Sequence, residues 1–267
     1  DGRSVPQLGY GVWQVADEVA ADVVVQAIEA GYRHIDTAAG YDNESGVGRA
    51  VKATGVPRED LFITTKLANG DQGFDAAQEA LETSLDKLDM DYVDLYLIHW
   101  ASPQRGTYPE SWKALIELQK QGKAKSIGVS NFPIAQLEEI ISETGVVPVM
   151  HQIELHPEFQ QSELRAYHAQ HDILTEAWSP LGQGGDILSN PVITEIANAH
   201  DADPGQVIIA WHLAIDNVVI PKSVTPKRIV SNFASAQLRL TGNEIERING
   251  LDNPDGRIGA DPANPGF

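Results

Sequence analysis

Short apolar, β-rich runs alternate along the chain with longer stretches in which apolar residues recur every three or four positions. The short runs predict strands and the longer stretches predict amphipathic helices. The helical spacing is clear at Leu81, Leu85 and Leu88. Pro and Gly occupy the joints between these segments, as in residues 54–57, where we expect turns.

The pattern predicts eight strands and eight helices. The strands cover residues 7–12, 34–37, 61–66, 92–99, 126–129, 147–153, 173–177 and 218–221. The helices cover residues 18–30, 43–54, 74–88, 109–121, 133–143, 161–171, 191–200 and 204–215. Such alternation within 267 residues predicts an α/β protein with a single (β/α)8 TIM barrel, and hence one domain over residues 1–267.

The main alternative is a doubly wound sheet with a dinucleotide-binding motif. That fold usually begins with a strand, a Gly-x-Gly-x-x-Gly turn and a helix. The Gly9-Tyr10-Gly11 run lacks the third glycine, and no other segment supplies the motif. The barrel is therefore the preferred interpretation.

Charge is distributed unevenly along the chain. The formal net charge is −19, which argues against a nucleic-acid partner because phosphates need a basic surface. Residues 1–215 hold 13 basic and 32 acidic side chains, whereas residues 216–267 hold 6 of each. Residues 216–240 are locally basic, with a balance of +3. This stretch is therefore a candidate site for an anion.

The composition also narrows the environment and the chemistry. No apolar run approaches the roughly 18–20 residues of a membrane span, so we expect no membrane partner. The chain contains no cysteine, which excludes disulfides, iron–sulfur clusters and a Cys nucleophile, and we expect a cytoplasmic protein. His168 and His171, and His151 and His156, lack a His-Glu-x-x-His pattern or an evident third ligand, so we predict no metal site.

Three polar residues stand at the carboxyl ends of successive predicted strands, where barrel enzymes place their active sites. They are Asp36, Lys66 and His99, and Tyr41 follows Asp36 by five residues. Taken singly, an Asp can cap a turn, a Tyr can pack in a loop and a His can be structural. Lys66 is harder to explain in this way, because its strand is apolar and a buried Lys needs a partner such as Asp36.

Together these side chains suit delivery of a proton to a carbonyl group that accepts a hydride. A phenol has a pKa of about 10, and a neighbouring ammonium lowers it. We therefore expect Lys66 to lower the pKa of Tyr41 and make it the general acid, with Asp36 holding Lys66 in place. We expect His99 to donate a hydrogen bond to the carbonyl oxygen and orient it.

The sequence resembles the aldo-keto reductase family over nearly its whole length and in the family's order. The residues that carry the resemblance are 31–39, Tyr41, Asn43, Glu44, 62–66, 93–100, 126–132 and 220–223. Within the family, residues 152–157, residues 178–184 and a short C-terminal tail are most similar to the bacterial 2,5-diketo-D-gluconic acid reductases. The tail lacks the long loop that closes over bulky substrates in animal relatives, which disfavours steroids.

The resemblance implies an NADPH-dependent enzyme that transfers hydride to small aldehydes, ketones or keto-sugar acids, with Asp36, Tyr41, Lys66 and His99 as the catalytic residues. It implies that the cofactor is bound by Ser130, Asn131, Gln152, Trp178, Ser179, Pro180, Leu181, Gly182, Gln183, Gly184, Lys222, Ser223, Arg228 and Asn232. In that assignment Trp178 stacks on the nicotinamide, and Lys222, Ser223 and Arg228 bind the 2′-phosphate. Trp13 and Trp100 match substrate-pocket walls.

Relatives of this kind also imply a monomer. Two other activities remain open from the sequence. One is a nucleotide-sensing regulatory barrel, which the complete set of Asp36, Tyr41, Lys66 and His99 disfavours. The other is a lyase or isomerase barrel in which Lys66 forms a Schiff base with the substrate.

Overall fold

In the computed structural model, which describes residues 1–266, the eight apolar runs pair side by side as parallel strands in chain order. The strands are β1 (Tyr10–Gly11), β2 (His34–Asp36), β3 (Phe62–Leu67), β4 (Val93–Ile98), β5 (Ala124–Ser130), β6 (Met150–Glu154), β7 (Leu174–Trp178) and β8 (Val218–Val219). A parallel bridge between Leu8 and Val219 joins the first strand to the last and closes the sheet. The predicted (β/α)8 barrel is thus confirmed.

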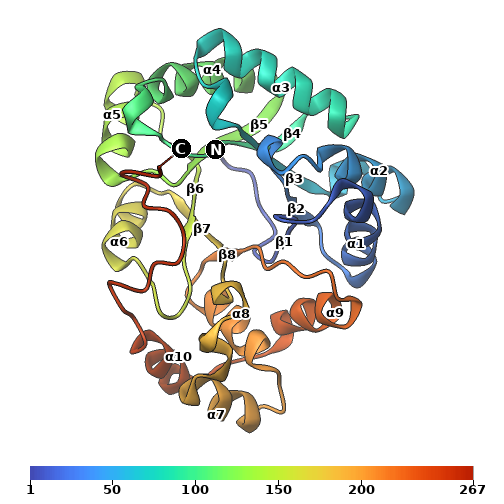
Figure 1. Ribbon diagram of the computed structural model, residues 1–267, viewed down its shortest axis with the longest axis vertical. Coiled ribbons are helices and arrows are strands. Elements are labelled where there is room, and N and C mark those ends of the chain that lie inside the picture. The colour runs from blue at the N-terminus through green and yellow to red at the C-terminus, as the bar shows by residue number, and fades with distance from the viewer. Residues whose placement is uncertain (267) are drawn as a thin grey trace.

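Helices form a ring around this sheet (Figure 1). They are α1 (Asp17–Ala30), α2 (Glu44–Thr54), α3 (Phe74–Leu88), α4 (Tyr108–Lys120), α5 (Ile134–Thr144), α6 (Ser162–Gln170), α7 (Pro191–Ala199), α8 (Pro204–Ala214), α9 (Pro226–Ala234) and α10 (Gly242–Asn249). Short 3-10 turns occupy several loops, and the one after β2, η1 (Ala39–Tyr41), carries Tyr41. No helix among residues 1–266 is long and apolar enough to cross a membrane.

The sequence pattern missed two helices, α9 and α10. Helix α9 starts with Pro226 in its first turn, and only Ile229 and Asn232 are buried along it, so its apolar stripe is narrow. Helix α10 has a capping box, in which Thr241 and Glu244 each bond to the backbone of the other. This Thr-x-x-Glu spacing is a recognised start signal that could have revealed the helix.

The strand bounds differ most from the prediction at β1, β6 and β8. Strand β6 begins at Met150 rather than at residue 147, and Pro148, which has no N–H to donate, precedes it. Strand β8 ends at Val219, before Pro221. Strand β1 covers two residues of the predicted 7–12, although the N–H of Gly9 still donates to the carbonyl of Val219 at 2.9 Å.

The barrel interior has an apolar part and a polar part, which follow one another along the barrel axis. Leu95, Leu97, Met150 and Val218 form a small apolar cluster inside it. The interior is tightly filled, since a Cβ at Gly128 would lie 2.4 Å from the carbonyl oxygen of Met150. Nearer the carboxyl ends of the strands the buried side chains become polar, and these ends form the floor of the functional cavity.

Candidate active site

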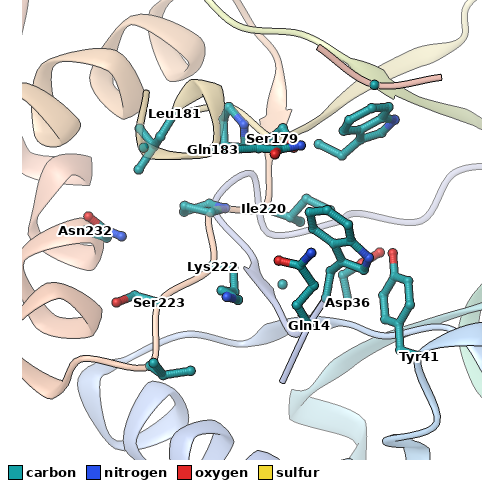
Figure 2. Close-up of a pocket in the computed structure, with 18 of the residues that line it drawn as sticks. Gln14, Asp36, Tyr41, Ser179, Leu181, Gln183, Ile220, Lys222, Ser223 and Asn232 are labelled. Atoms are coloured by element: carbon teal, nitrogen blue, oxygen red, sulfur yellow. The ribbon is translucent and has the colours of Figure 1, made fainter. Parts of the chain in front are cut away.

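A cavity of about 1100 Å³ opens at the carboxyl ends of the strands. Asp36 and Tyr41 lie at one end of it and Asn232 at the other, as Figure 2 shows. Leu181 and Gln183 face Ile220 and Lys222 across the space between them. This elongated shape gives the site two ends with different chemistry.

Lys66 and Asp36 form a buried ion pair at the floor. The Nζ atom of Lys66 lies 2.7 Å from Oδ2 of Asp36 and also donates to the carbonyl of Thr37 at 2.8 Å. Burial lowers the pKa of Lys66, but the charge of Asp36 and the phenol of Tyr41 raise it more, so the net pKa lies above its ordinary value. The ammonium is therefore charged at neutral pH, and the predicted pairing is confirmed.

Tyr41 reaches the same ammonium from η1. Its phenolic oxygen lies 3.4 Å from Nζ of Lys66, which also stands 4.9 Å from the centre of the Tyr41 ring. The loop is held by Asn43, whose amide donates to the carbonyls of Val12 and Val15 at 2.9 and 2.8 Å. Tyr41 is thus fixed at the cavity floor.

The pKa of Tyr41 differs from the expectation in its net direction. Burial raises the pKa of Tyr41, and the Lys66 charge lowers it by less, so the pKa lies above its ordinary value. The prediction that Lys66 favours the phenolate is correct, but the prediction of a net lowered pKa is wrong for the protein alone. The reason is that desolvation of the partly buried phenol, which disfavours its anion, outweighs the Lys66 charge.

His99 follows β4 and packs against Tyr41. The two ring centres are 5.6 Å apart at an interplanar angle of 73°. Burial and the Lys66 charge lower the pKa of His99 to about 3. The imidazole is therefore neutral at physiological pH and has one N–H to donate.

The next strands bring Asn131 and Gln152 to this floor. Asn131 adopts a left-handed backbone conformation with φ of 56° directly after β5. Its amide nitrogen donates to the carbonyl of His99 at 3.1 Å and to Oγ of Ser130 at 3.0 Å. Ser130 itself donates to the carbonyl of Gln152 at 2.9 Å and lies outside the cavity lining. Asn131 thus links His99 to the neighbouring strands.

Trp178 ends β7 and is held on two sides. Its indole N–H donates to Oδ1 of Asn131 at 2.8 Å. The C-terminal tail passes against its ring, where a Cβ at Gly259 would lie 2.4 Å from Cη2 of Trp178. The tail is secured by Glu154, which accepts the N–H groups of Ile258 at 2.6 Å and Gly259 at 2.9 Å. The indole is thus a fixed platform on the cavity wall.

The loop after Trp178 lines the cavity with Ser179, Pro180, Leu181, Gln183 and Gly184. Several of its residues have positive φ, including Ser179 at 48°, Gly182 at 56° and Gln183 at 55°. Gly182 lies outside the lining, and a Cβ there would be 2.9 Å from Cγ2 of Ile187. The loop thus borders the cavity and is a candidate for binding a phosphate.

Three cations gather toward the Asn232 end of the cavity. Lys222, Lys227 and Arg228 all line it, together with Ser223 and Asn232. Within residues 1–266, none of the three forms an ion pair. A group of unpaired cations suits a dianionic phosphate, so these residues fit the 2′-phosphate of NADPH. Lys227 was not among the predicted contacts.

The two residues predicted as substrate walls belong to the same cavity. Trp13 and Trp100 both line the cavity, and the Trp13 side chain is 43% exposed. Gln72 donates from its amide to the carbonyl of Trp100 at 2.7 Å. Both tryptophans thus line the same cavity as Tyr41 and His99.

One buried carboxyl at the floor was not predicted. Glu176, inside β7, accepts a hydrogen bond at 2.7 Å from the amide nitrogen of Gln152, which also donates to Oδ1 of Asp36 at 2.8 Å. Burial and the neighbouring charge of Asp36 raise the pKa of Glu176 to about 8. In the sequence this residue is one Glu in a short strand, and nothing there indicates that it faces inward.

Two buried histidines lie close together outside the cavity lining. Within the described residues no three His, Cys, Asp or Glu side chains are placed to bind a metal ion. His151 and His168 instead bond to each other through Nδ1 and Nε2 at 2.8 Å. His168 bonds onward to Oγ1 of Thr175 at 2.8 Å, so this pair connects β6, α6 and β7.

Comparison with known proteins places this geometry in one family. Residues 7–253 match the family described as Aldo/keto reductase. The chain is 52% identical over 263 residues to the methylglyoxal reductase DkgA of Escherichia coli K12, covering 98% of this chain and 94% of that relative. It is 51% identical over 267 residues to an aldo-keto reductase of Mycolicibacterium smegmatis, covering 100% of this chain and 96% of that protein.

Solved structures of relatives have the same fold. A point mutant of Gox0644 in complex with NADPH has a TM-score of 0.96 and 47% identity, covering 100% of this chain and 96% of that one. An aldo/keto reductase from Brucella melitensis has a TM-score of 0.91 and 52% identity, covering 94% of this chain and 96% of that one. The chain belongs to the aldo/keto reductase family and is an NADP-dependent oxidoreductase.

Proposed function

We propose that residues 1–267 act as one catalytic domain that uses NADPH to reduce the carbonyl group of small aldehydes, ketones or keto-sugar acids. The observation that carries this proposal is the contact of Lys66 Nζ with both Asp36 and Tyr41, at 2.7 and 3.4 Å, on the floor of the cavity. The unpaired cations toward the other end of the cavity support the choice of NADPH over NADH.

The chain's own residues divide the binding of the cofactor between them. Trp178 offers the face for the nicotinamide ring, and Asn131 and Gln152, supported by Ser130, hold its carboxamide. The loop of residues 179–184 wraps the pyrophosphate. Lys222, Ser223 and Arg228 take the 2′-phosphate and Asn232 the adenine. When bound, NADPH supplies the hydride that adds to the carbonyl carbon.

Tyr41 supplies the proton that completes the reduction. Its O–H delivers the proton to the carbonyl oxygen, and the charged Lys66 stabilises the phenolate that remains. Asp36 holds Lys66 in position through the 2.7 Å ion pair. His99, which is neutral, donates its N–H to the carbonyl oxygen and aligns it with Tyr41. This division of roles accounts for every catalytic residue at the floor.

The Schiff-base alternative requires Lys66 to act as a neutral amine. Its raised pKa and its contacts with Asp36 and Thr37 keep it charged and fully bonded. An ammonium has no lone pair with which to attack a carbonyl. The reductase is therefore the function that the site supports.

The substrate can be narrowed to a chemical class. The E. coli K12 relative is named a methylglyoxal reductase, and the sequence resemblance points to 2,5-diketo-D-gluconate. Both are small dicarbonyl compounds, which suits a cavity lined by the aromatic side chains of Trp13 and Trp100. We propose dicarbonyls of this size as substrates.

A screen of NADPH oxidation tests this proposal. The compounds are methylglyoxal, 2,5-diketo-D-gluconate, dihydroxyacetone and simple aldehydes. We expect turnover with at least one dicarbonyl and a higher kcat/KM than for the simple aldehydes. If none of these compounds causes the absorbance of NADPH to fall, the proposed activity is wrong.

A further inference from the structure

A second carboxyl group lies beneath the catalytic residues, and the mechanism above does not use it. Glu176 is fully buried inside the barrel, and the amide of Gln152 connects it to Asp36. One hydrogen of this amide goes to each carboxyl group, at 2.8 Å for Asp36 and 2.7 Å for Glu176. The orientation of the Gln152 amide is therefore fixed by two acceptors.

The other oxygen of Glu176 lies near a ring nitrogen that has no hydrogen to donate. Burial lowers the pKa of His34 to about 4, so this imidazole is neutral. Its Nδ1 lies 3.3 Å from the carbonyl oxygen of Pro6, which can only accept, so Nδ1 carries the hydrogen and Nε2 does not. Oε1 of Glu176 stands 3.6 Å from that Nε2 and has no hydrogen-bond partner among residues 1–266. This Nε2 accepts from the hydroxyl of Thr64 at 3.2 Å, so neither His34 nor Thr64 has a hydrogen left for Oε1. An ionised Oε1 would therefore be a buried charge without a donor.

The charge balance of the barrel interior also favours a protonated Glu176. The titratable groups around Glu176 are His34 and Asp36 from β2, Lys66 from β3 and Tyr41 from η1. Lys66 is the one cation among these groups, and it already pairs with Asp36 at 2.7 Å. A second buried anion would be left without a counter-charge, which is costly in a low-dielectric interior.

We propose that Glu176 is a positioning residue that keeps its proton while the enzyme reduces a carbonyl, and that losing this proton weakens Tyr41 as the proton donor. Glu176 acts through Tyr41, so this inference rests on the proposed function. The charge of an ionised Glu176 raises the pKa values of both Tyr41 and Lys66. Tyr41 then holds its proton more tightly, and reduction slows as pH rises.

The substitution Glu176→Gln separates charge from shape. Its amide oxygen can still accept from Gln152, and its neutral NH2 group takes the place of the other oxygen, so it imitates the uncharged acid. Glu44→Gln is the matched control, because Glu44 is also buried but lies on α2, where it accepts from Oγ1 of Thr65 at 2.6 Å. Both variants remove one buried carboxyl and keep the volume.

The first readout is kcat/KM for the carbonyl substrate at saturating NADPH from pH 6 to pH 10. We expect the wild type and Glu44→Gln to lose activity on the alkaline side from about pH 8, where Glu176 ionises. We expect Glu176→Gln to keep wild-type activity within about threefold at pH 7 and to move the alkaline fall upward by about one pH unit. An unchanged alkaline fall in Glu176→Gln would overturn the proposal.

The second readout needs no turnover. In the apoenzyme labelled with ¹³C at the glutamate carboxyl carbons, one signal should titrate well above the ordinary range for Glu and should be missing in Glu176→Gln. If every signal that disappears in this variant titrates below pH 6, Glu176 is ionised at neutral pH and the proposal is wrong. Because this measurement uses no substrate, its failure is distinct from a failure of the proposed reductase activity.

Discussion

The Nζ atom of Lys66 lies 3.4 Å from the phenolic oxygen of Tyr41. Burial alone would keep the Tyr41 proton in place, and the Lys66 charge is the nearest influence that favours its release. Proton delivery by Tyr41 therefore depends on this neighbour, and the strength of that dependence can be measured.

Replacing Lys66 should separate catalysis from binding. In Lys66→Met we expect kcat/KM for the carbonyl to fall by about 10²-fold or more, because the phenolate loses its counter-charge. The Kd of NADPH should change by less than about threefold, since Lys66 lies outside the cavity lining. Lys113→Met, on the exposed face of α4, is the control and should match the wild type. A kcat/KM of Lys66→Met within tenfold of the wild type would contradict the assignment.

Arg228 should discriminate between the two nicotinamide cofactors. A hydrogen bond to a charged group is worth about 1.5–3 kcal/mol, so Arg228→Ala should raise the Kd of NADPH by about 10- to 100-fold. The Kd of NADH should stay nearly constant, because NADH lacks the 2′-phosphate. Arg239→Ala is the control, since Arg239 belongs to the same basic stretch but bonds to the carbonyl of Ala236 at 2.6 Å. Equal losses for both cofactors would remove Arg228 from the phosphate site.

The tail contact at Trp178 gives a prediction about steric fit. In Gly259→Ala the new Cβ would lie 2.4 Å from Cη2 of Trp178 and 2.8 Å from Oε2 of Glu154, so the indole or the tail must move. We expect the Kd of NADPH to rise by about tenfold, measured by quenching of tryptophan fluorescence. Gly70→Ala is the control, because a Cβ at Gly70 meets nothing within 4 Å. Identical affinities in the two variants would show that the tail does not hold the platform.

Buried histidines predict a loss of stability in acid. Burial lowers the pKa values of His34 and His168 to about 4 and of His99 and His212 to about 3, whereas the unfolded chain has ordinary histidines. The unfolded state therefore binds more protons as pH falls below about 6.5, and the native state loses stability between that pH and about 4. Urea unfolding should give a smaller free energy of unfolding at pH 5 than at pH 7.5. Equal values would mean that these residues bind protons in the native state.

Much of the site follows from the sequence, because barrel topology fixes where strand ends meet. Asp36, Lys66 and His99 stand at the ends of three successive apolar runs, so the (β/α)8 fold alone places them together. Their distances and the sign of the pKa shift at Tyr41 do not follow, since both depend on how deeply the phenol is buried.

Glu176 illustrates what a single sequence leaves open. Its strand covers five residues, Leu174–Trp178, too few for alternation to show which side chains face inward. Its orientation is set by its register, which pairs it with Gln152 on β6 and with Val218 on β8. The contact between Gly259 and Trp178 is equally hidden, because it joins an irregular tail to a distant strand.

The most direct test of the central claim is the behaviour of Tyr41→Phe with NADPH and a reducible dicarbonyl. The substitution removes the proton donor and leaves the ring against His99, 5.6 Å between centres in the wild type. We predict that reduction falls by about 10²- to 10⁴-fold while the Kd of NADPH changes by less than about threefold. Turnover near the wild-type rate in this variant would show that Tyr41 is not the general acid.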